Sequence, residues 1–204
     1  MTEDTLNVMK ARNVYVITTR AVGDVAKRAT LRGAMFFQDE LIRSTTPPWM
    51  MAKVAEEIER LQSDNNYAQQ SFDLGFHQQM QDNLARLFEA GIPLVAGTDN
   101  DGLFIGDDLH FELELLVDAG LTPLEAITTA TKNAALLMEN EEEWGTLEAG
   151  KRADILLVNG RPDKNISDTR KIELVIQKGR VLDRERLVFD SQTDMGIRDT
   201  NTDY

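Results

Sequence analysis

The sequence predicts an α/β fold with a parallel sheet, and three observations support this prediction. A compact apolar run, Ile92 to Ala96, is bounded by Gly91 and Gly97 and is too short for a helix. Such a run is typical of a buried strand of a parallel sheet. A second run, Val14 to Thr19, is rich in β-branched and aromatic residues and also predicts a strand. Amphipathic helical patterns lie between these two runs and also after residue 96, as expected of an α/β chain.

Apolar residues recur at helical spacing in five segments. These patterns predict helices over residues 3–11, 49–62, 78–90, 109–119 and 123–138. Gly91 is a suitable residue to end the helix over 78–90. Thr122 to Glu125 forms a helix start, with Thr as the N-cap, Pro next and Glu three residues after the cap. In the helix over 109–119 we expect one buried face, formed by Leu109, Leu113, Leu116 and Val117.

From Trp144 onward the apolar spacing changes from helical to strand-like. Strands are predicted over 155–158, 174–177 and 180–182, and Lys178-Gly179 is a candidate two-residue hairpin turn. Residues 144–189 therefore predict a small β portion, and the polar residues 190–204 predict a disordered tail. Residues 20–48 are either an excursion that shapes a substrate pocket or a surface insertion.

Composition excludes several classes of function. Of the 204 residues 42% are hydrophobic, enough for a core, and the net charge is −13. Because an acidic surface repels phosphate groups, nucleic acid and anionic membranes are poor partners. The absence of cysteine excludes disulfides, thiolate metal sites and a cysteine nucleophile. The first residues are polar and resemble no signal peptide, and no apolar run approaches the ~20 residues of a membrane span. We therefore expect a cytoplasmic protein.

Asp99 is the main candidate for a site residue. It follows the predicted strand 92–96 at its C-terminal end, which is the edge where α/β folds bind ligands. From the residues alone, Asp99 is either a site carboxylate or the first residue of an Asx-turn. Its neighbour Asn100 is a further candidate for substrate contact. Thr19 either contacts substrate or makes strand-end hydrogen bonds, and His110 either lines a pocket or is a packed or solvated helix-start residue.

Four stretches together resemble the amidohydrolase superfamily, in its imidazolonepropionase-like and prolidase-like branch. They are GIPLVAGTD at 91–99, residues 109–126, ATKNAA at 130–135 and GTLEAGKRAD at 145–154. The resemblance implies part of a (β/α)8 TIM barrel, with 14–19 as its seventh strand and 92–96 as its eighth, followed by a portion of a β-sandwich. We accordingly expect residues 1–143 to be the C-terminal part of the barrel and residues 144–189 to belong to the sandwich.

The same resemblance implies a hydrolase that depends on a divalent metal, zinc by expectation, and cleaves a C–N bond in a cyclic amide or a peptide-like small molecule. Asp99 would be a metal ligand and the base that takes a proton from the attacking water. The family's other ligands include a His-x-His pair and further histidines on earlier strands, whereas this sequence has only His77 and His110.

The resemblance therefore implies the C-terminal half of such an enzyme, which we expect to be inactive alone. Its expected partner is a second copy or the missing N-terminal half of the barrel. The alternative is a non-catalytic α/β remnant or binding module that acts through oligomerisation.

Overall fold

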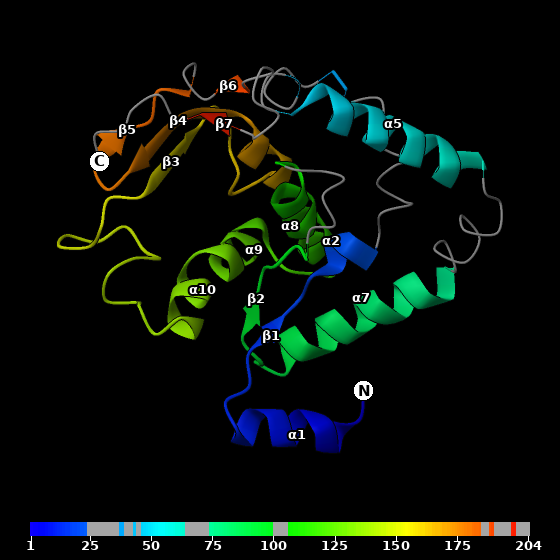
Figure 1. The fold of residues 1–204 in the computed structure, drawn as a ribbon. Helices are drawn as coiled ribbons and strands as arrows, with labels where there is room; N and C mark the ends of the chain where they lie inside the picture. The colour runs from blue at the N-terminus through cyan, green and yellow to red at the C-terminus, as the bar shows by residue number, and fades with distance from the viewer. Residues whose placement is uncertain are drawn as a thin grey trace. The chain divides into compact units, whose positions relative to one another are not determined.

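The computed structural model describes residues 1–23, 37–38, 43, 46–63, 74–99, 106–184, 188–189 and 197–198. Helices and strands both occur along the chain, so the predicted mixed α/β class is confirmed (Figure 1). The chain divides into two compact units. One comprises Met1–Gly23, Leu74–Asp99 and Asp108–Leu182, and the other includes helix α5 and strands β6 and β7. Within the described part of the chain, no helix is long and apolar enough to cross a membrane.

Strands β1 (Val16–Ile17) and β2 (Leu94–Val95) form a parallel pair in the first unit, with Val16 opposite Leu94 and Ile17 opposite Val95. The Thr18 N–H extends the pairing by donating to the Val95 carbonyl at 3.0 Å. Both strands lie within the runs that the sequence predicts as strands. Because they are parallel, their carboxyl ends meet at the same edge of the sheet.

Helix α1 (Glu3–Ala11) precedes β1, and helix α7 (Leu74–Glu89) leads directly into β2. The predicted end of α7 at Gly91 is confirmed, since this glycine has a φ of +73°. Its N–H donates to the Phe88 carbonyl at 2.8 Å, and the Ile92 N–H donates to the Leu87 carbonyl at 3.0 Å. These two bonds satisfy carbonyls that the end of the helix would otherwise leave unpaired.

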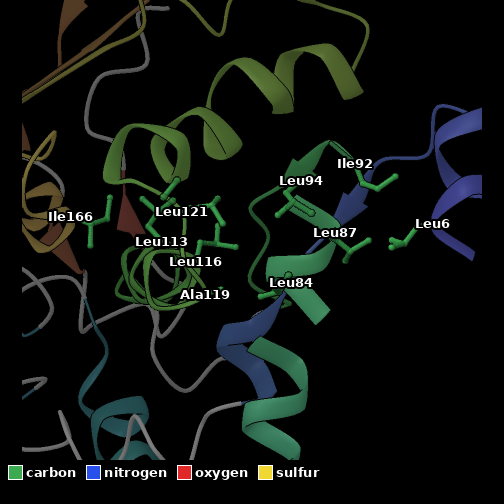
Figure 2. Close-up of a cluster of buried hydrophobic side chains, with 11 residues drawn as sticks. Leu6, Leu84, Leu87, Ile92, Leu94, Leu113, Leu116, Ala119, Leu121 and Ile166 are labelled. Atoms are coloured by element: carbon green, nitrogen blue, oxygen red, sulfur yellow. The ribbon is translucent and has the colours of Figure 1, made fainter. Parts of the chain in front are cut away.

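The hydrophobic core of the first unit is contributed by helices and strands far apart in the sequence, as Figure 2 shows. Leu94 in β2 and Leu116 in helix α8 (Asp108–Asp118) are almost completely buried. The buried members of the cluster are Leu6, Leu84, Leu87, Ile92, Leu94, Leu113, Leu116, Ala119, Leu121, Ala126 and Ile166. Burial of this apolar surface is the main force that holds β2 among its helices.

Helix α8 (Asp108–Asp118) is buried on two sides, and the prediction of a single buried face is wrong. Its Leu113 and Leu116 belong to the main core cluster. Phe111 and Leu115, on another side, form a separate buried cluster with Ala21 of helix α2 (Arg20–Gly23). Leu109 lies in the first turn and is 44% exposed, although its spacing placed it on the buried face.

Helices α9 (Pro123–Ala130) and α10 (Lys132–Leu137) replace the single helix predicted over 123–138. The predicted start of α9 is confirmed. The Glu125 N–H donates to Thr122 Oγ1, and the Thr122 N–H donates back to the Glu125 carboxylate at 2.7 Å. The Thr122 hydroxyl and N–H lower the pKa of the Glu125 carboxyl.

The interruption at Thr131 has a cause in β2. The Thr129 carbonyl accepts a hydrogen bond from the Ala96 N–H at 3.2 Å. Two residues after the interruption, Asn133 Nδ2 donates to the Leu94 carbonyl at 2.8 Å. These bonds reach β2 on the edge that does not face β1. The helix therefore departs from regular geometry in order to satisfy backbone groups of a strand.

Strands β3 (Ile155–Val158), β4 (Ile172–Gln177) and β5 (Arg180–Val181) form an antiparallel sheet close to the predicted positions. A 3-10 helix, η1 (Ile166–Arg170), lies between β3 and β4 and was not predicted. The hairpin turn at 178–179 is confirmed, with φ of +49° at Lys178 and +78° at Gly179.

Asp154 stabilises the hairpin turn at 178–179, because its Oδ1 accepts a hydrogen bond from the Lys178 N–H at 2.8 Å. This bond is the main cause of the lowered pKa of the Asp154 carboxyl, and Arg152 contributes a further hydrogen bond and its charge.

In the second unit, helix α5 (Pro48–Ser63) matches the helix predicted over 49–62 and buries Val54 and Ile58. Strands β6 (Val188–Phe189) and β7 (Ile197–Arg198) pair antiparallel. The predicted disordered tail, 190–204, lies outside the described residues except for β7. Most of the predicted excursion over 20–48 is outside them as well. The proposed boundary between residues 143 and 144 stays a prediction.

Candidate active site

Asp99 lies four residues after Val95, past the carboxyl end of β2, and its side chain is exposed. Its φ is +46°, in the left-handed region that Asp tolerates better than most residues. The neighbouring strand β1 ends at the same edge with Thr18 and Thr19, and Thr19 also has a positive φ, of +41°. The parallel pairing thus places a carboxylate and two hydroxyl side chains at the end of the sheet where α/β folds bind ligands.

Gly97 brings these two strand ends close together. A Cβ atom added at Gly97 would lie 2.5 Å from Ile17 Cγ2 and 3.1 Å from Thr19 Cγ2. Both distances are shorter than ordinary van der Waals contacts, so the chain requires glycine here for steric reasons. The close approach fixes Thr19 beside the segment that leads to Asp99.

Glu112 is a buried carboxylate at the same strand end that the sequence interpretation missed. It lies in α8 with a relative exposure of 0%. Its Oε1 accepts a hydrogen bond from the Thr18 hydroxyl, and its Oε2 accepts one from the Ala21 N–H at 2.6 Å. Burial raises the pKa of the Glu112 carboxyl, and the hydrogen bonds together with the charge of Arg20 partly offset this effect.

A signal for Glu112 does exist in the sequence. Phe111, Leu113, Leu115 and Leu116 surround it at positions that point to different sides of a helix. A helix with apolar residues on several sides leaves little solvent-facing surface for a charged residue. Glu112 is thus a candidate buried acid, but only the fold identifies its partners.

The structure places the other candidates differently. His110 Nδ1 lies 2.9 Å from Thr169 Oγ1, so this ring contacts the 3-10 helix η1. Asn100 lies outside the described residues. Thr19 is the candidate that the fold brings near the segment of Asp99, through Gly97. The roles of Asp99, Asn100, Thr19 and His110 toward a substrate stay predictions.

The sequence model of the amidohydrolase family matches residues 2–182, which is most of the chain. The chain belongs to the amidohydrolase family. The resemblance inferred from the four sequence stretches is thereby confirmed.

Among curated proteins, this chain is similar to imidazolonepropionases. It is 30% identical over 117 residues to that of Thermoplasma acidophilum, covering 57% of this chain and 28% of that protein. It is 44% identical over 79 residues to that of Rubrobacter xylanophilus, covering 38% of this chain and 19% of that protein. The chain therefore spans less than a third of the length of these relatives.

Solved structures share the fold of this chain. A Xaa-Pro dipeptidase with bound methionine matches with a TM-score of 0.62 and 22% identity, over 89% of this chain and 37% of that one. Molinate hydrolase matches with a TM-score of 0.58 and 20% identity, over 92% of this chain and 36% of that one. At these identities the likeness concerns the fold, which is the mixed α/β fold described above.

The family raises the question of whether the residues present fit a metal ion. Protein sites for zinc use three or four histidine, cysteine or carboxylate ligands. Within the described ranges of this amidohydrolase, no three His, Asp or Glu side chains come together in a way that would hold a metal. Asp99 supplies one carboxylate, so the donor set of the described residues does not fit a metal ion by itself.

Proposed function

We propose that this amidohydrolase chain is the C-terminal part of a hydrolase that cleaves a C–N bond in a cyclic amide or peptide-like small molecule. The observation that carries the proposal is the position of Asp99, at the carboxyl end of β2 and beside the end of the parallel strand β1. The family match over residues 2–182 and the similarity to imidazolonepropionases support the reaction class.

In this proposal β1 and β2 are the last two strands of a (β/α)8 barrel, within residues 1–143. Residues 144–189 contribute to a β-sandwich beside it. The parallel pairing of β1 with β2 and the antiparallel sheet of β3, β4 and β5 support this division. A complete barrel needs about 250 residues, so further strands must come from other polypeptide, either an N-terminal portion or a partner chain.

Asp99 is suited to proton transfer. Its carboxylate oxygens can accept a proton from an attacking water and pass it to a leaving amine. A divalent metal, expected to be zinc, would lower the pKa of that water. Because the described residues provide one ligand of such a site, we assign to this chain only the proton transfer at the Asp99 carboxylate.

Two measurements test the proposal. First, the genomic DNA on the 5′ side of the Met1 codon is sequenced. An in-frame segment that encodes a His-x-His strand supports the proposal, whereas an in-frame stop codon, with no His-x-His barrel portion encoded by a neighbouring gene, contradicts the catalytic role. The latter result would favour a non-catalytic binding module.

Second, the longer polypeptide encoded there is assayed against imidazolone propionate and a panel of Xaa-Pro dipeptides. Asp99→Asn should lower kcat by at least about a hundredfold, the usual contribution of a positioned acid or base. The matched control is Asp118→Asn, which removes an exposed carboxylate at the end of α8. Equal activity of the Asp99 variant and its control would contradict the role of Asp99.

A further inference from the structure

The burial of Glu112 requires an explanation that core packing does not provide. A carboxylate removed from water loses hydration, and this loss is recovered only when its oxygens accept good hydrogen bonds. Leucine would fill a similar volume in α8 without this cost, as Leu113, Leu115 and Leu116 do in the same helix. What leucine cannot do is accept hydrogen bonds from Thr18, after β1, and from Ala21 in α2.

The two oxygens of Glu112 accept hydrogen bonds from two residues that follow the end of β1. Oε1 accepts from the hydroxyl of Thr18, the residue directly after the strand, and Oε2 accepts from the N–H of Ala21 in α2. Thr19 and Arg20 lie between these two points, so one carboxylate fixes both ends of a four-residue bend. Thr19 has its positive φ within this bend.

The bend in turn contacts the segment that carries Asp99. The Thr19 methyl group approaches Gly97 so closely that an added Cβ would lie 3.1 Å from it. Asp99 is two residues further along the chain. All of these residues belong to the same compact unit. Contacts thus run from Glu112 through the bend to Gly97, and the backbone continues from Gly97 to the candidate catalytic residue Asp99.

We infer that Glu112 is a positioning residue, which holds the Thr19 bend against Gly97 and thereby sets the position of the Asp99 carboxylate. The inference rests on the proposed function of Asp99. Displacing a reacting group by about 1 Å can lower a rate by roughly a hundredfold. A buried carboxylate that keeps the Thr19 bend in place would prevent such a displacement of Asp99.

Three variants separate a positioning role from simple packing. Glu112→Ala removes both acceptors. Glu112→Gln keeps one acceptor and can still make both hydrogen bonds, because its amide oxygen can accept from the Ala21 N–H while its amide nitrogen donates to Thr18 Oγ1. The Thr18 hydroxyl can then donate to the Val95 carbonyl, 3.4 Å away. Thr18→Val removes one of the two bonds at nearly constant volume.

The matched control is Glu114→Ala, two residues along the same helix. The Glu114 carboxylate accepts from Ser167 Oγ at 2.8 Å and from Arg170 Nε at 3.3 Å, both in η1, not in β1. Loss of this carboxylate should therefore affect α8 and its stability without moving the Thr19 bend.

The first readout is the nuclear Overhauser effect between the Thr19 methyl and the Gly97 Hα protons, measured on the 204-residue chain. We expect it in the wild type, in Glu112→Gln and in Glu114→Ala, and we expect its loss in Glu112→Ala and its weakening in Thr18→Val. The methyl chemical shifts of Leu94 and Leu116, both almost completely buried in the core cluster, report whether the core is intact. Persistence of the Thr19–Gly97 effect in Glu112→Ala with an intact core would overturn the inference.

The second readout is hydrolysis by the longer polypeptide. Glu112→Ala should lower kcat by roughly ten- to a hundredfold with little change in KM, and Glu112→Gln should restore most of it. The two proposals fail separately. If Glu112→Ala loses the Thr19–Gly97 effect but Asp99→Asn keeps full activity, the role of Glu112 in holding the bend stands and the proposed function is overturned. If Asp99→Asn is inactive but Glu112→Ala has an unchanged kcat, the positioning role alone is overturned.

Discussion

At the scale of single residues, Gly97 is the position where the two strand ends have the least room. An alanine there would place its Cβ 2.5 Å from Ile17 Cγ2, so β1 and the segment after β2 would have to separate. We expect Gly97→Ala to lower the free energy of unfolding by about 1–3 kcal/mol, the usual cost of overpacking. Urea titration of the chain measures this.

The double variant Gly97→Ala/Ile17→Ala serves as the control, because it removes the clashing Cγ2 atom. It should recover part of the loss that Gly97→Ala causes, so the two substitutions should not be additive. A loss below about 0.5 kcal/mol in Gly97→Ala alone would mean that Ile17 rotates away at little cost.

Glu112 predicts a pH dependence with a definite sign. Burial raises the pKa of its carboxyl in the folded chain above that in the unfolded chain, which is about 4.3. The contribution of Glu112 to stability is therefore fully present below the unfolded pKa and is lost as pH rises through the folded pKa. Relative to Glu112→Gln, which does not titrate, the wild type should lose stability as pH rises from about 4.3, the unfolded pKa, through the higher folded pKa.

Urea titrations of both proteins across this range measure the difference. Glu125→Gln is a control of opposite sign, because hydrogen bonds from Thr122 lower the pKa of the Glu125 carboxyl. That contribution is present above the unfolded pKa and is lost as pH falls through the folded one. It should be small, since the Glu125 side chain is exposed and solvent screens it. A stability difference between wild type and Glu112→Gln that stays constant with pH would contradict the assignment for Glu112.

At the scale of elements, the start of α9 is held by its own capping box. Thr122 Oγ1 accepts from the Glu125 N–H, and the Glu125 carboxylate accepts from the Thr122 N–H. Thr122→Ala should lower the free energy of unfolding by about 1 kcal/mol, the typical loss of an N-cap. The control is Thr128→Ala in the same helix, whose hydroxyl donates to the Leu124 carbonyl and caps nothing. Equal losses in both variants, by urea titration, would contradict the capping role.

The sequence predicts those elements whose signals are local. The capping box of α9, the glycine end of α7 and the hairpin turn at Lys178-Gly179 each depend on a few adjacent residues, and all three were found. The interruption between α9 and α10 was not found, because its cause is two hydrogen bonds to β2, more than thirty positions earlier in the chain. The helix propensities of residues 123–138 do not depend on a hydrogen-bond partner so far away in the sequence, so they could not predict the interruption.

In the candidate site, too, the residues with local signals could be predicted and those that depend on tertiary contacts could not. The position of Asp99 at a strand end could be predicted, since a glycine-bounded apolar run is a local signal. The partners of Glu112 could not, because Thr18 lies 94 positions away in the chain and meets it only after α8 packs on α2. Residues that position a site through tertiary contacts are thus harder to predict than residues at the ends of strands.

At the scale of the whole molecule, the ligand set predicts weak metal binding. Within the described residues no group of three His, Asp or Glu side chains could hold a metal, and Asp99 is exposed. In equilibrium dialysis with zinc chloride we expect the 204-residue chain to bind weakly and Asp99→Ala to bind equally weakly. Tight uptake of one zinc per chain that Asp99→Ala abolishes would contradict this expectation.

The proposed partial barrel also predicts self-association. Within the described residues β1 and β2 form a two-stranded sheet. On the edge of β2 away from β1, the Leu94 carbonyl accepts from Asn133 and the Ala96 N–H donates to the Thr129 carbonyl. Within the same residues, β1 pairs with β2 alone, and its Ile17 is 53% exposed. Because an exposed apolar strand edge is a template for pairing with another chain, we expect a second copy to associate along β1 unless an N-terminal barrel portion covers it.

Sedimentation velocity at several protein concentrations measures this association. Ile17→Lys should shift the chain toward the monomer, since a charge on an edge strand opposes pairing. The matched control is Val8→Lys on α1, because Val8 has the same exposure of 53% but lies on no strand. A stable wild-type monomer with a sharp two-state melt would contradict the prediction, and so would an equal shift in both variants. The first of these results would also weaken the case that β1 and β2 belong to a larger barrel, because such strands should not be stable with an open edge.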